Sequence, residues 1–165
     1  MAEDIEFRQV DESQDPVLRN LLNLYMHDMA EWFLFDSEED GRYTYATEPL
    51  WESGVGVHIA YNGRIPVGFG LVASAAEYSD VPGARDLEEF FVVRRYRREG
   101  VGRAFANHLW DLYRGPWVVR VYQRNLPALP FWRATVSAYT DGRFVERILS
   151  VRDRPWSYFS FDSAD

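Results

Sequence analysis

The sequence contains neither cysteine nor lysine, and each absence removes a class of chemistry. Without cysteine the chain has no disulfide, no thiolate metal site and no acyl-cysteine intermediate. Without lysine it has no lysine Schiff base and no phosphate-binding loop that ends in Gly-Lys-Ser or Gly-Lys-Thr. All 18 basic residues are arginine, so a covalent step through a side-chain thiol or a lysine amine is excluded.

Long hydrophobic runs are also missing. The longest candidate, Ile65 to Ala76, carries Pro66, Gly68 and Gly70 and falls short of the roughly 20 residues that span a bilayer. The N-terminus has acidic residues where a signal peptide would be positively charged and then apolar. We therefore expect no membrane partner and a cytoplasmic location.

Histidine is scarce and positive charge is outweighed. His27, His58 and His108 lie far apart without the spacing of a local metal motif, so we expect no metal site. The net charge of −8 opposes binding to duplex nucleic acid, whose phosphates the average field repels. It mildly favours cationic or neutral ligands.

The chain is predicted to be one domain over residues 1–165. Its 165 residues are 47% hydrophobic and 27% charged, which suits a globular protein with a sizeable core. We find no internal repeat, low-complexity tract or linker. Asp15-Pro16 is typical of a helix start, and Asn62-Gly63 is a strong hairpin signal.

Hydrophobic periodicity predicts alternating strands and helices. This order indicates an α/β or α+β domain with a mixed sheet and helices on both faces. Residues 36–54 are predicted to be loop with at most a short helical turn. The predicted strands are 5–10, 55–61, 65–74, 87–93, 117–122, 143–149 and 156–161, and the predicted helices run from 15 to about 35, from 101 to 113 and from 127 to about 136.

The most informative segment, Leu87 to Ala104, reads LEEFFVVRRYRREGVGRA. It is a strand, a basic turn and then glycines that open a helix. A helix start presents unpaired N–H groups and partial positive charge, so it is a preformed anion site. Gly100 and Gly102 let the backbone approach an anion closely, and Arg97, Arg98 and Arg103 suit a pyrophosphate. The alternative is an ordinary strand-to-helix turn with solvated arginines.

A second motif follows the next strand. After Val92, the pattern Arg97-x-x-Gly100-x-Gly102 is followed by Asn125-x-x-Ala128-x-x-Phe131-Trp132. In this order and context the sequence resembles the GNAT superfamily of N-acetyltransferases, over nearly the full chain, and within it a bacterial subgroup of predicted acetyltransferases. The resemblance implies an α/β (α+β) fold with a mixed, largely antiparallel sheet of about six or seven strands, flanked by helices.

The resemblance further implies acetyl-CoA as acyl donor, held where the strand of Leu87–Val93 and the strand of Trp117–Tyr122 splay apart. The pantetheine arm would pair with backbone groups of Val92 and Val93, and N–H groups of the turn would cradle the pyrophosphate. The implied cofactor-binding residues are Phe91, Val92, Val93, Arg97, Arg98, Glu99, Gly100, Val101, Gly102, Arg103, Asn125, Ala128, Phe131 and Trp132.

Direct attack by an amine on the thioester is expected, because the chain has no thiol to accept the acyl group. Val92 N–H would stabilise the oxyanion, and Glu89 is the first candidate for general base. Glu89 is alternatively a strand-end carboxylate paired with an arginine. The family's usual acidic tyrosine is replaced by Trp132, whose indole is no acid. Tyr122, Tyr139 or solvent would then protonate the leaving thiolate, and Phe131 and Trp132 are equally compatible with core packing.

The acceptor side is implied by the resemblance to involve the first helix, the loop after it and the central strands. Aromatic faces with carboxylates at the rim would suit a cationic amine of a small molecule or peptide. The alternative is that these residues are solvated loop or core side chains. The matching residues are Tyr25, Asp36, Tyr43, Tyr45, Trp51 and His58.

Two other functions stay open on sequence grounds. Trp132 and the unproved base are compatible with an acyl-CoA-binding module that does not catalyse. The arginines from Arg94 to Arg103, with Tyr96, are compatible with single-stranded RNA binding, which the acidic net charge opposes. The sequence does not say which amine is the acceptor, which acyl chains are used or whether the chain forms a homodimer.

Overall fold

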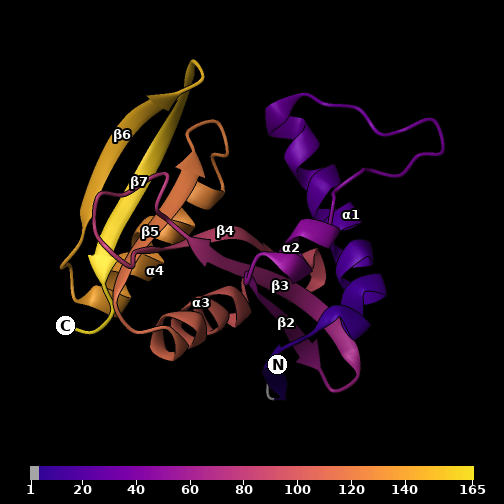
Figure 1. Ribbon diagram of the computed structural model, residues 1–165, viewed down its shortest axis with the longest axis horizontal. Helices are drawn as coiled ribbons and strands as arrows, with labels where there is room; N and C mark the ends of the chain where they lie inside the picture. The colour runs from indigo at the N-terminus through magenta and orange to yellow at the C-terminus, as the bar shows by residue number, and fades with distance from the viewer. Residues whose placement is uncertain (1–3) are drawn as a thin grey trace. The chain divides into compact units, whose positions relative to one another are not determined.

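Strands and helices alternate along the chain in the computed structural model, which describes residues 4–165 (Figure 1). The strands are β1 (Ile5–Gln9), β2 (Gly56–Asn62), β3 (Ile65–Ser74), β4 (Arg85–Val92), β5 (Pro116–Tyr122), β6 (Val145–Val151) and β7 (Arg154–Asp162). The α-helices are α1 (Asp15–Phe33), α2 (Glu48–Glu52), α3 (Val101–Leu112) and α4 (Ala128–Thr140), and the 3₁₀ turns are η1 (Glu12–Gln14) and η2 (Arg94–Tyr96).

The strands hydrogen-bond in the order β1-β2-β3-β4-β5-β7-β6. β1 with β2, β5 with β7 and β6 with β7 are antiparallel, whereas β4 and β5 are parallel. The predicted α/β class and the mixed, largely antiparallel sheet flanked by helices are confirmed. The register of β4 with β5 pairs Arg85 with Trp117 and Asp86 with Val118. The splaying of these two strands stays a prediction.

Two compact units divide the chain, and each is described by itself. Unit 1 holds the residues up to Leu71 together with Glu89–Gly102, and unit 2 holds Val72–Glu88 and Arg103–Asp165. Strands β3 and β4 and helix α3 each contribute residues to both units. The expectation of a single domain over residues 1–165 stays a prediction.

Helix α1 begins as its sequence predicts and covers the core of unit 1. Pro16 occupies its first turn, where a missing N–H costs no helical hydrogen bond. The helix ends where Leu34 adopts a left-handed conformation, with φ 57°, and donates its N–H to Ala30. The buried side chains that α1 shares with the other elements of unit 1 are Leu18, Leu21, Leu22, Leu50, Val57, Ile59, Tyr61, Phe69, Leu71 and Phe91.

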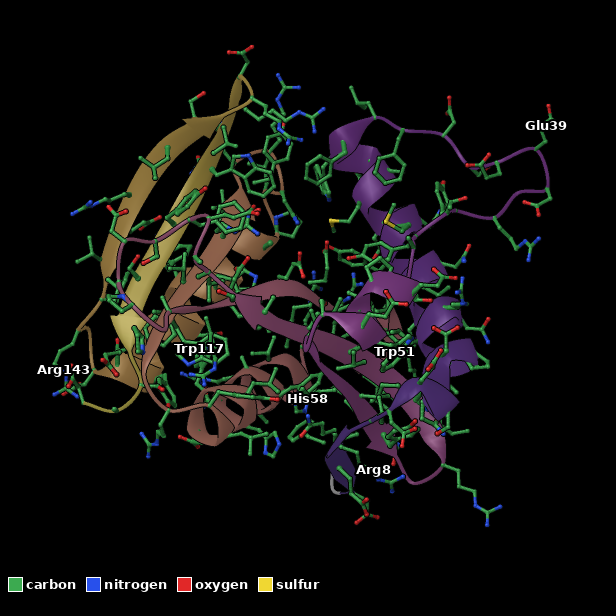
Figure 2. All side chains as sticks on the ribbon, in the orientation of Figure 1. Arg8, Glu39, Trp51, His58, Trp117 and Arg143 are labelled. Carbon is green, nitrogen blue, oxygen red and sulfur yellow. The ribbon has the colours of Figure 1, made fainter. Side chains whose placement is uncertain are left out.

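In unit 2, β7 pairs with β5 along one edge and with β6 along the other. Trp110 of α3 packs edge-on against Tyr139 of α4 and Phe161 of β7, with 5.0 Å between ring centroids in each pair. Trp117 of β5, labelled in Figure 2, donates its indole N–H to the Tyr113 carbonyl at 2.9 Å. Aromatic contacts therefore join the helices to the sheet within this unit.

A buried ion pair links β4 and β5 in unit 2. Arg120 donates to Asp86 at 2.5 Å, and only 16% and 2% of their side-chain areas are exposed. The Arg120 guanidinium also lies 3.6 Å from the centre of the Tyr78 ring. Burial raises the pKa of Asp86, and the hydrogen bond and charge of Arg120 act in the opposite direction. Sequence reasoning did not single out this pair.

Element boundaries were predicted less well than the elements themselves. The hairpin of β2 and β3 turns at Gly63–Arg64, and the short helical turn expected in residues 36–54 is α2. The strand predicted over residues 143–149 begins later, at Val145, because Asp141 and Gly142 take left-handed conformations with φ 53° and 77° that end α4 in a turn. The 3₁₀ turns η1 and η2 were not predicted.

Close approach of β3 to β4 requires a glycine in unit 1. A Cβ atom at Gly68 would lie 2.4 Å from the carbonyl oxygen of Phe91. That oxygen belongs to the backbone and cannot swing aside, so any side chain at this position would force the two strands apart.

We therefore predict that Gly68→Ala lowers the free energy of unfolding by about 1–3 kcal/mol, the typical cost of overpacking. Urea denaturation measures this change, and Ile65→Ala on the same strand is the control because Ile65 is 59% exposed. A Gly68→Ala variant as stable as the unmodified protein would contradict the close approach.

Candidate active site

At the end of β4, the N–H and the carbonyl of one residue point away from β3. Val93 N–H donates to the Val67 carbonyl at 2.8 Å. Successive residues of a strand direct their backbone groups to opposite edges, so the N–H and carbonyl of Val92 point away from β3. The Val93 N–H is thus bound to β3, and the predicted pairing of the pantetheine arm with backbone groups of Val92 and Val93 stays a prediction.

The turn between β4 and α3 has the shape of an anion-binding nest. Arg98 adopts a left-handed conformation with φ 64°, and Gly100 follows with φ 83°. Such alternation brings consecutive N–H groups to one side of the chain. Helix α3 begins directly afterwards at Val101, so its unpaired N–H groups and partial positive charge lie at the same place.

Arg97 differs from the mobile phosphate ligand that the sequence indicates. Its Nε donates to the Val92 carbonyl at 2.7 Å, and its Nη2 donates to Asp28 Oδ2 at 2.6 Å. Arg94 donates to the other oxygen of Asp28 at 2.7 Å. The turn is therefore anchored to α1 by a carboxylate that sequence reasoning missed, since no local pattern links residue 28 to residues 94 and 97.

Glu89, the predicted general base, is part-buried against α1. It accepts a hydrogen bond from the hydroxyl of Tyr25. The Tyr25 ring packs edge-on against Phe69 and Phe91, at centroid distances of 5.5 and 6.1 Å. Tyr25 thus contacts the candidate base, and the predicted pairing of Glu89 with an arginine stays a prediction.

Glu88 is a second carboxylate of β4, in unit 2. The pKa of Glu88 is raised by burial and by the neighbouring charge of Asp86, and the charge of Arg120 opposes this shift only in part. A raised carboxyl pKa is common among catalytic acids and bases. Glu88 is therefore the natural comparison for any test of Glu89.

The second sequence motif forms the start of α4. The backbone of Asn125 donates to the Tyr122 carbonyl at 2.9 Å, and its own carbonyl accepts from Ala128 at 3.1 Å. Phe131 and Trp132 contact each other, and buried Trp132 lies 6.3 Å from Trp110, centroid to centroid. The contacts of Trp132 agree with core packing in unit 2, and a contact of this motif with the donor stays a prediction.

The two tyrosines offered as replacements for the missing acid lie in different settings. Tyr139 of α4 donates its hydroxyl to Asp111 of α3 at 2.8 Å, and burial and this contact raise its pKa to about 12. Such a group yields its proton less readily than a thiol with pKa near 8.5. Tyr122 of β5 is buried beside Trp156, with centroids 5.3 Å apart. The role of either tyrosine as the acid stays a prediction.

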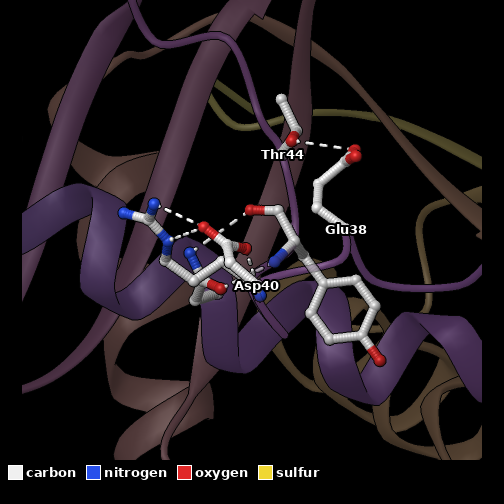
Figure 3. Close-up of polar contacts among 6 residues, drawn as sticks. Glu38, Asp40 and Thr44 are labelled. Carbon is white, nitrogen blue, oxygen red and sulfur yellow. Dashed lines mark hydrogen bonds and ion pairs between the residues drawn. The ribbon is translucent and has the colours of Figure 1, made fainter.

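The loop between α1 and α2 is fixed to α1 by Asn23. The Asn23 side chain accepts from the Tyr43 N–H at 2.9 Å and donates to the Tyr43 carbonyl at 3.3 Å, and Figure 3 shows these contacts beside those of Glu38 with Thr44 and of Asp40 with Arg42. A cavity of about 430 Å³ lies here, and Tyr43 and Tyr45 are among its walls.

The other predicted acceptor residues do not line this cavity. Trp51 donates its indole N–H to Asp15 at 2.8 Å and packs on the core of unit 1. Asp36 lies on the exposed loop. His58, labelled in Figure 2, is fully buried on β2, and its assignment as an acceptor contact stays a prediction. Among the predicted acceptor residues, the cavity brings together Tyr43 and Tyr45 only.

Residues 4–165 show neither a metal-binding cluster nor a membrane-spanning helix. Within this range, no group of three or more His, Asp or Glu side chains is placed to hold a metal ion. Across the same residues, no helix has the length and apolar character needed to cross a membrane.

The mixed, largely antiparallel sheet flanked by helices is the fold of solved acetyltransferases. The sequence matches the model of the acetyltransferase (GNAT) family over residues 20–135. The chain therefore belongs to this family, and it is an N-acetyltransferase whose acyl donor is acetyl-CoA. No curated protein matched the sequence.

Solved structures of three N-acetyltransferases or aminoglycoside acetyltransferases share the fold. Aminoglycoside acetyltransferase AAC(6')-Ib, in complex with coenzyme A and kanamycin, has a TM-score of 0.68 at 18% identity, covering 96% of this chain and 95% of that chain. Spermidine N-acetyltransferase from Vibrio cholerae, in complex with CoA and spermine, has a TM-score of 0.66 at 12% identity, covering 98% of this chain and 96% of that chain. Ribosomal-protein-S18-alanine N-acetyltransferase from Escherichia coli has a TM-score of 0.64 at 12% identity, covering 98% of this chain and 95% of that chain.

Asp28 gives the site a pH-dependent contribution to stability. Burial acts to raise its pKa, but the hydrogen bonds and charges of Arg97 and Arg94 together lower it below its ordinary value. A carboxylate with a lowered folded-state pKa stabilises the fold above its unfolded-state pKa, and this stabilisation is lost as the pH falls.

We predict that Asp28→Asn lowers the free energy of unfolding by about 1–2 kcal/mol at neutral pH, the scale of charge-assisted hydrogen bonds. The difference between variant and unmodified protein should shrink below the ordinary pKa of aspartate, near 3.9. Urea unfolding at a series of pH values measures it. An equal difference at pH 7 and at pH 3 would contradict the proposed ion pair.

Proposed function

We propose that this protein transfers the acetyl group of acetyl-CoA directly to the amine of a small molecule or peptide. One observation carries this proposal. In unit 1, the outward N–H of Val92 at the end of β4 is followed within the same segment by the nest at Arg98 and Gly100. A strand edge suits the amide groups of a pantetheine arm, and the nest suits a pyrophosphate.

The reaction that this arrangement supports has two bond changes. The amine nitrogen attacks the thioester carbonyl carbon and forms the new C–N bond. The negative charge that develops on the carbonyl oxygen is stabilised by the N–H of Val92. The C–S bond then breaks and CoA leaves as a thiolate. The proton that the acylated nitrogen sheds goes to solvent, and the thiolate takes up a proton from solvent or from a general acid.

Glu89 takes the proton that the acceptor ammonium must lose before its nitrogen can attack, directly or through a water molecule. Its contact with the Tyr25 hydroxyl supports this role, because a hydrogen bond from a packed side chain fixes the orientation of the carboxylate. Tyr25 is then a support for the base rather than a direct ligand of the acceptor.

The acceptor is proposed only by class. The printed substrates of the similar structures are chemically diverse, being an aminoglycoside, a polyamine and an alanine of a ribosomal protein. The cavity beside α1 offers Tyr43, Tyr45 and Glu38, which suit a positively charged amine through ring faces and a carboxylate. Arg19 and Arg42 also line it and make its charge mixed.

A second candidate function is that of a catalytically weak member of the family, which acts mainly as an acyl-CoA-binding module. The packing of Trp132 against Trp110 favours it, because the position of the family's usual acid is filled by a core side chain. RNA binding is less well supported, since Arg94 and Arg97 are both held by Asp28. Calorimetry with acetyl-CoA, CoA and desulfo-CoA, followed by a panel of amines, separates these functions.

We predict that Gly102→Glu weakens acetyl-CoA binding by about tenfold or more, equivalent to about 1.4 kcal/mol. The variant places a side chain and a negative charge at the first turn of α3, where the pyrophosphate is proposed to bind. Isothermal titration calorimetry measures the affinity. Ala138→Glu, at an exposed position of α4, adds the same charge elsewhere and should bind normally. An unchanged affinity of Gly102→Glu for acetyl-CoA would contradict pyrophosphate binding at the start of α3.

We predict that Glu89→Gln lowers kcat by roughly 10²- to 10⁴-fold, the usual contribution of a general base, with acetyl-CoA affinity nearly intact. Steady-state kinetics on an amine that the unmodified enzyme acetylates, measured across pH, tests this. Glu88→Gln is the matched control on the neighbouring residue. A normal rate in Glu89→Gln at every pH, with a large loss in Glu88→Gln, would transfer the role to Glu88.

A further inference from the structure

Arg97 joins three features of unit 1. Its Nε donates to the Val92 carbonyl at 2.7 Å, and its Nη2 donates to Asp28 at 2.6 Å. The guanidinium carbon lies 5.3 Å from the centre of the Phe91 ring, within reach of a cation–π contact. One side chain therefore contacts the backbone of the proposed oxyanion residue, its neighbour on β4 and helix α1.

Asp28 holds this guanidinium from the helix side. Only 13% of its side-chain area is exposed, and its two oxygens accept from Arg94 and Arg97. A carboxylate that is largely removed from water depends on such partners, because an unpaired buried charge is strongly unfavourable. The ion pair of Asp28 and Arg97 is thus expensive to open, and Arg97 does not behave as a freely moving cation.

Asp28 also lies one helical turn beyond Tyr25, and residues three apart share a face of a helix. Tyr25 binds Glu89, and Asp28 binds the arginines of the turn. The same face of α1 therefore contacts β4 and its exit at two points. One contact is with the proposed base, Glu89, and the other is with Arg97, which holds the Val92 carbonyl.

We infer that Arg97 is a positioning residue. It fixes the peptide between Val92 and Val93 through the Val92 carbonyl, next to the Val92 N–H that would stabilise the oxyanion, and it is itself held by Asp28. This inference rests on the proposed function of Val92. It replaces the expectation that the Arg97 side chain binds pyrophosphate, and it leaves that task to the backbone N–H groups of the turn. Helix α1, through Asp28 and Arg97, then restrains the backbone of the residue whose N–H would stabilise the oxyanion.

The two roles of Arg97 predict opposite effects of Asp28→Asn. If Arg97 were a phosphate ligand, loss of Asp28 would release its positive charge and tighten acetyl-CoA binding. If Arg97 positions Val92, loss of Asp28 leaves acetyl-CoA binding unchanged and lowers kcat. The carboxylate itself lies on α1, outside the turn proposed to bind phosphate.

The first experiment compares Asp28→Asn, Arg97→Gln and the control Arg95→Gln. Arg95 lies in the same turn, is 71% exposed and pairs with Glu99, so its loss changes the charge of the turn without touching Val92. We expect Asp28→Asn and Arg97→Gln to lower kcat by roughly 10- to 100-fold, as expected for a misplaced catalytic group, with dissociation constants for acetyl-CoA within about threefold of normal. Arg95→Gln should keep both values.

A second measurement tests the contact without catalysis. The amide resonance of Val92, observed in the ligand-free protein with ¹⁵N-labelled valine, should shift in Asp28→Asn and Arg97→Gln but not in Arg95→Gln. Failure of the unmodified protein to bind acetyl-CoA or to acetylate any amine would overturn the proposed function. A normal Val92 resonance in both variants would overturn the positioning contact.

The kinetic outcomes also decide between the two roles. Tighter acetyl-CoA binding in Asp28→Asn, with at least about tenfold weaker binding in Arg97→Gln, would overturn the inference and make Arg97 a phosphate ligand. A loss of kcat in Arg97→Gln that Arg97→Lys partly restores supports positioning, because an ammonium can reach one of the two partners but lacks the fork that joins both.

Discussion

The hydrogen bond from Val93 N–H to the Val67 carbonyl sets the direction of everything proposed at this site. Because backbone groups alternate along a strand, this one contact turns the Val92 peptide away from β3. Gly68 allows the approach that makes the contact, since any Cβ there would meet the Phe91 carbonyl. The orientation of Val92 thus depends on the absence of a Cβ atom at Gly68 of β3.

The turn that follows β4 combines unfavourable backbone geometry with favourable electrostatics. Arg98 occupies a left-handed conformation that side chains other than glycine adopt at a cost. Four arginines lie close together in the sequence at this turn, at positions 94, 95, 97 and 98, although the whole chain has a net charge of −8. Asp28 neutralises part of this local charge. The first N–H groups of α3 have no helical acceptor, as at any helix start, and suit an anion.

The fold was largely predictable from local pattern. Strand β3 matches its predicted range, Ile65–Ser74, and the hairpin signal Asn62-Gly63 precedes the observed turn. Each depends on periodicity or on turn chemistry, which a sequence displays directly. The start of β6 was misplaced because a turn at Asp141 and Gly142 delays it, and strand ends are decided by pairing partners rather than by the strand's own residues.

The candidate site was predictable only in part. The motif of Arg97, Gly100 and Gly102 indicated the anion-binding turn, because a helix start with glycines is a local feature. The role of the Arg97 side chain was not, since its partners are a carbonyl five residues back and a carboxylate 69 residues away in sequence. The resemblance implied His58 as an acceptor contact, and its full burial on β2 follows from neighbours that the sequence does not identify.

By itself the sequence determined the order of the elements, the absence of thiol and lysine chemistry and the family motif. These are properties of composition and of short-range spacing. Only the tertiary structure decided that Val92 rather than Val93 offers its N–H, that Asp28 holds Arg97 and that Trp132 packs against Trp110. Such contacts join residues distant in sequence, and their geometry depends on strand register and helix packing, which arise from the whole core rather than from any one segment.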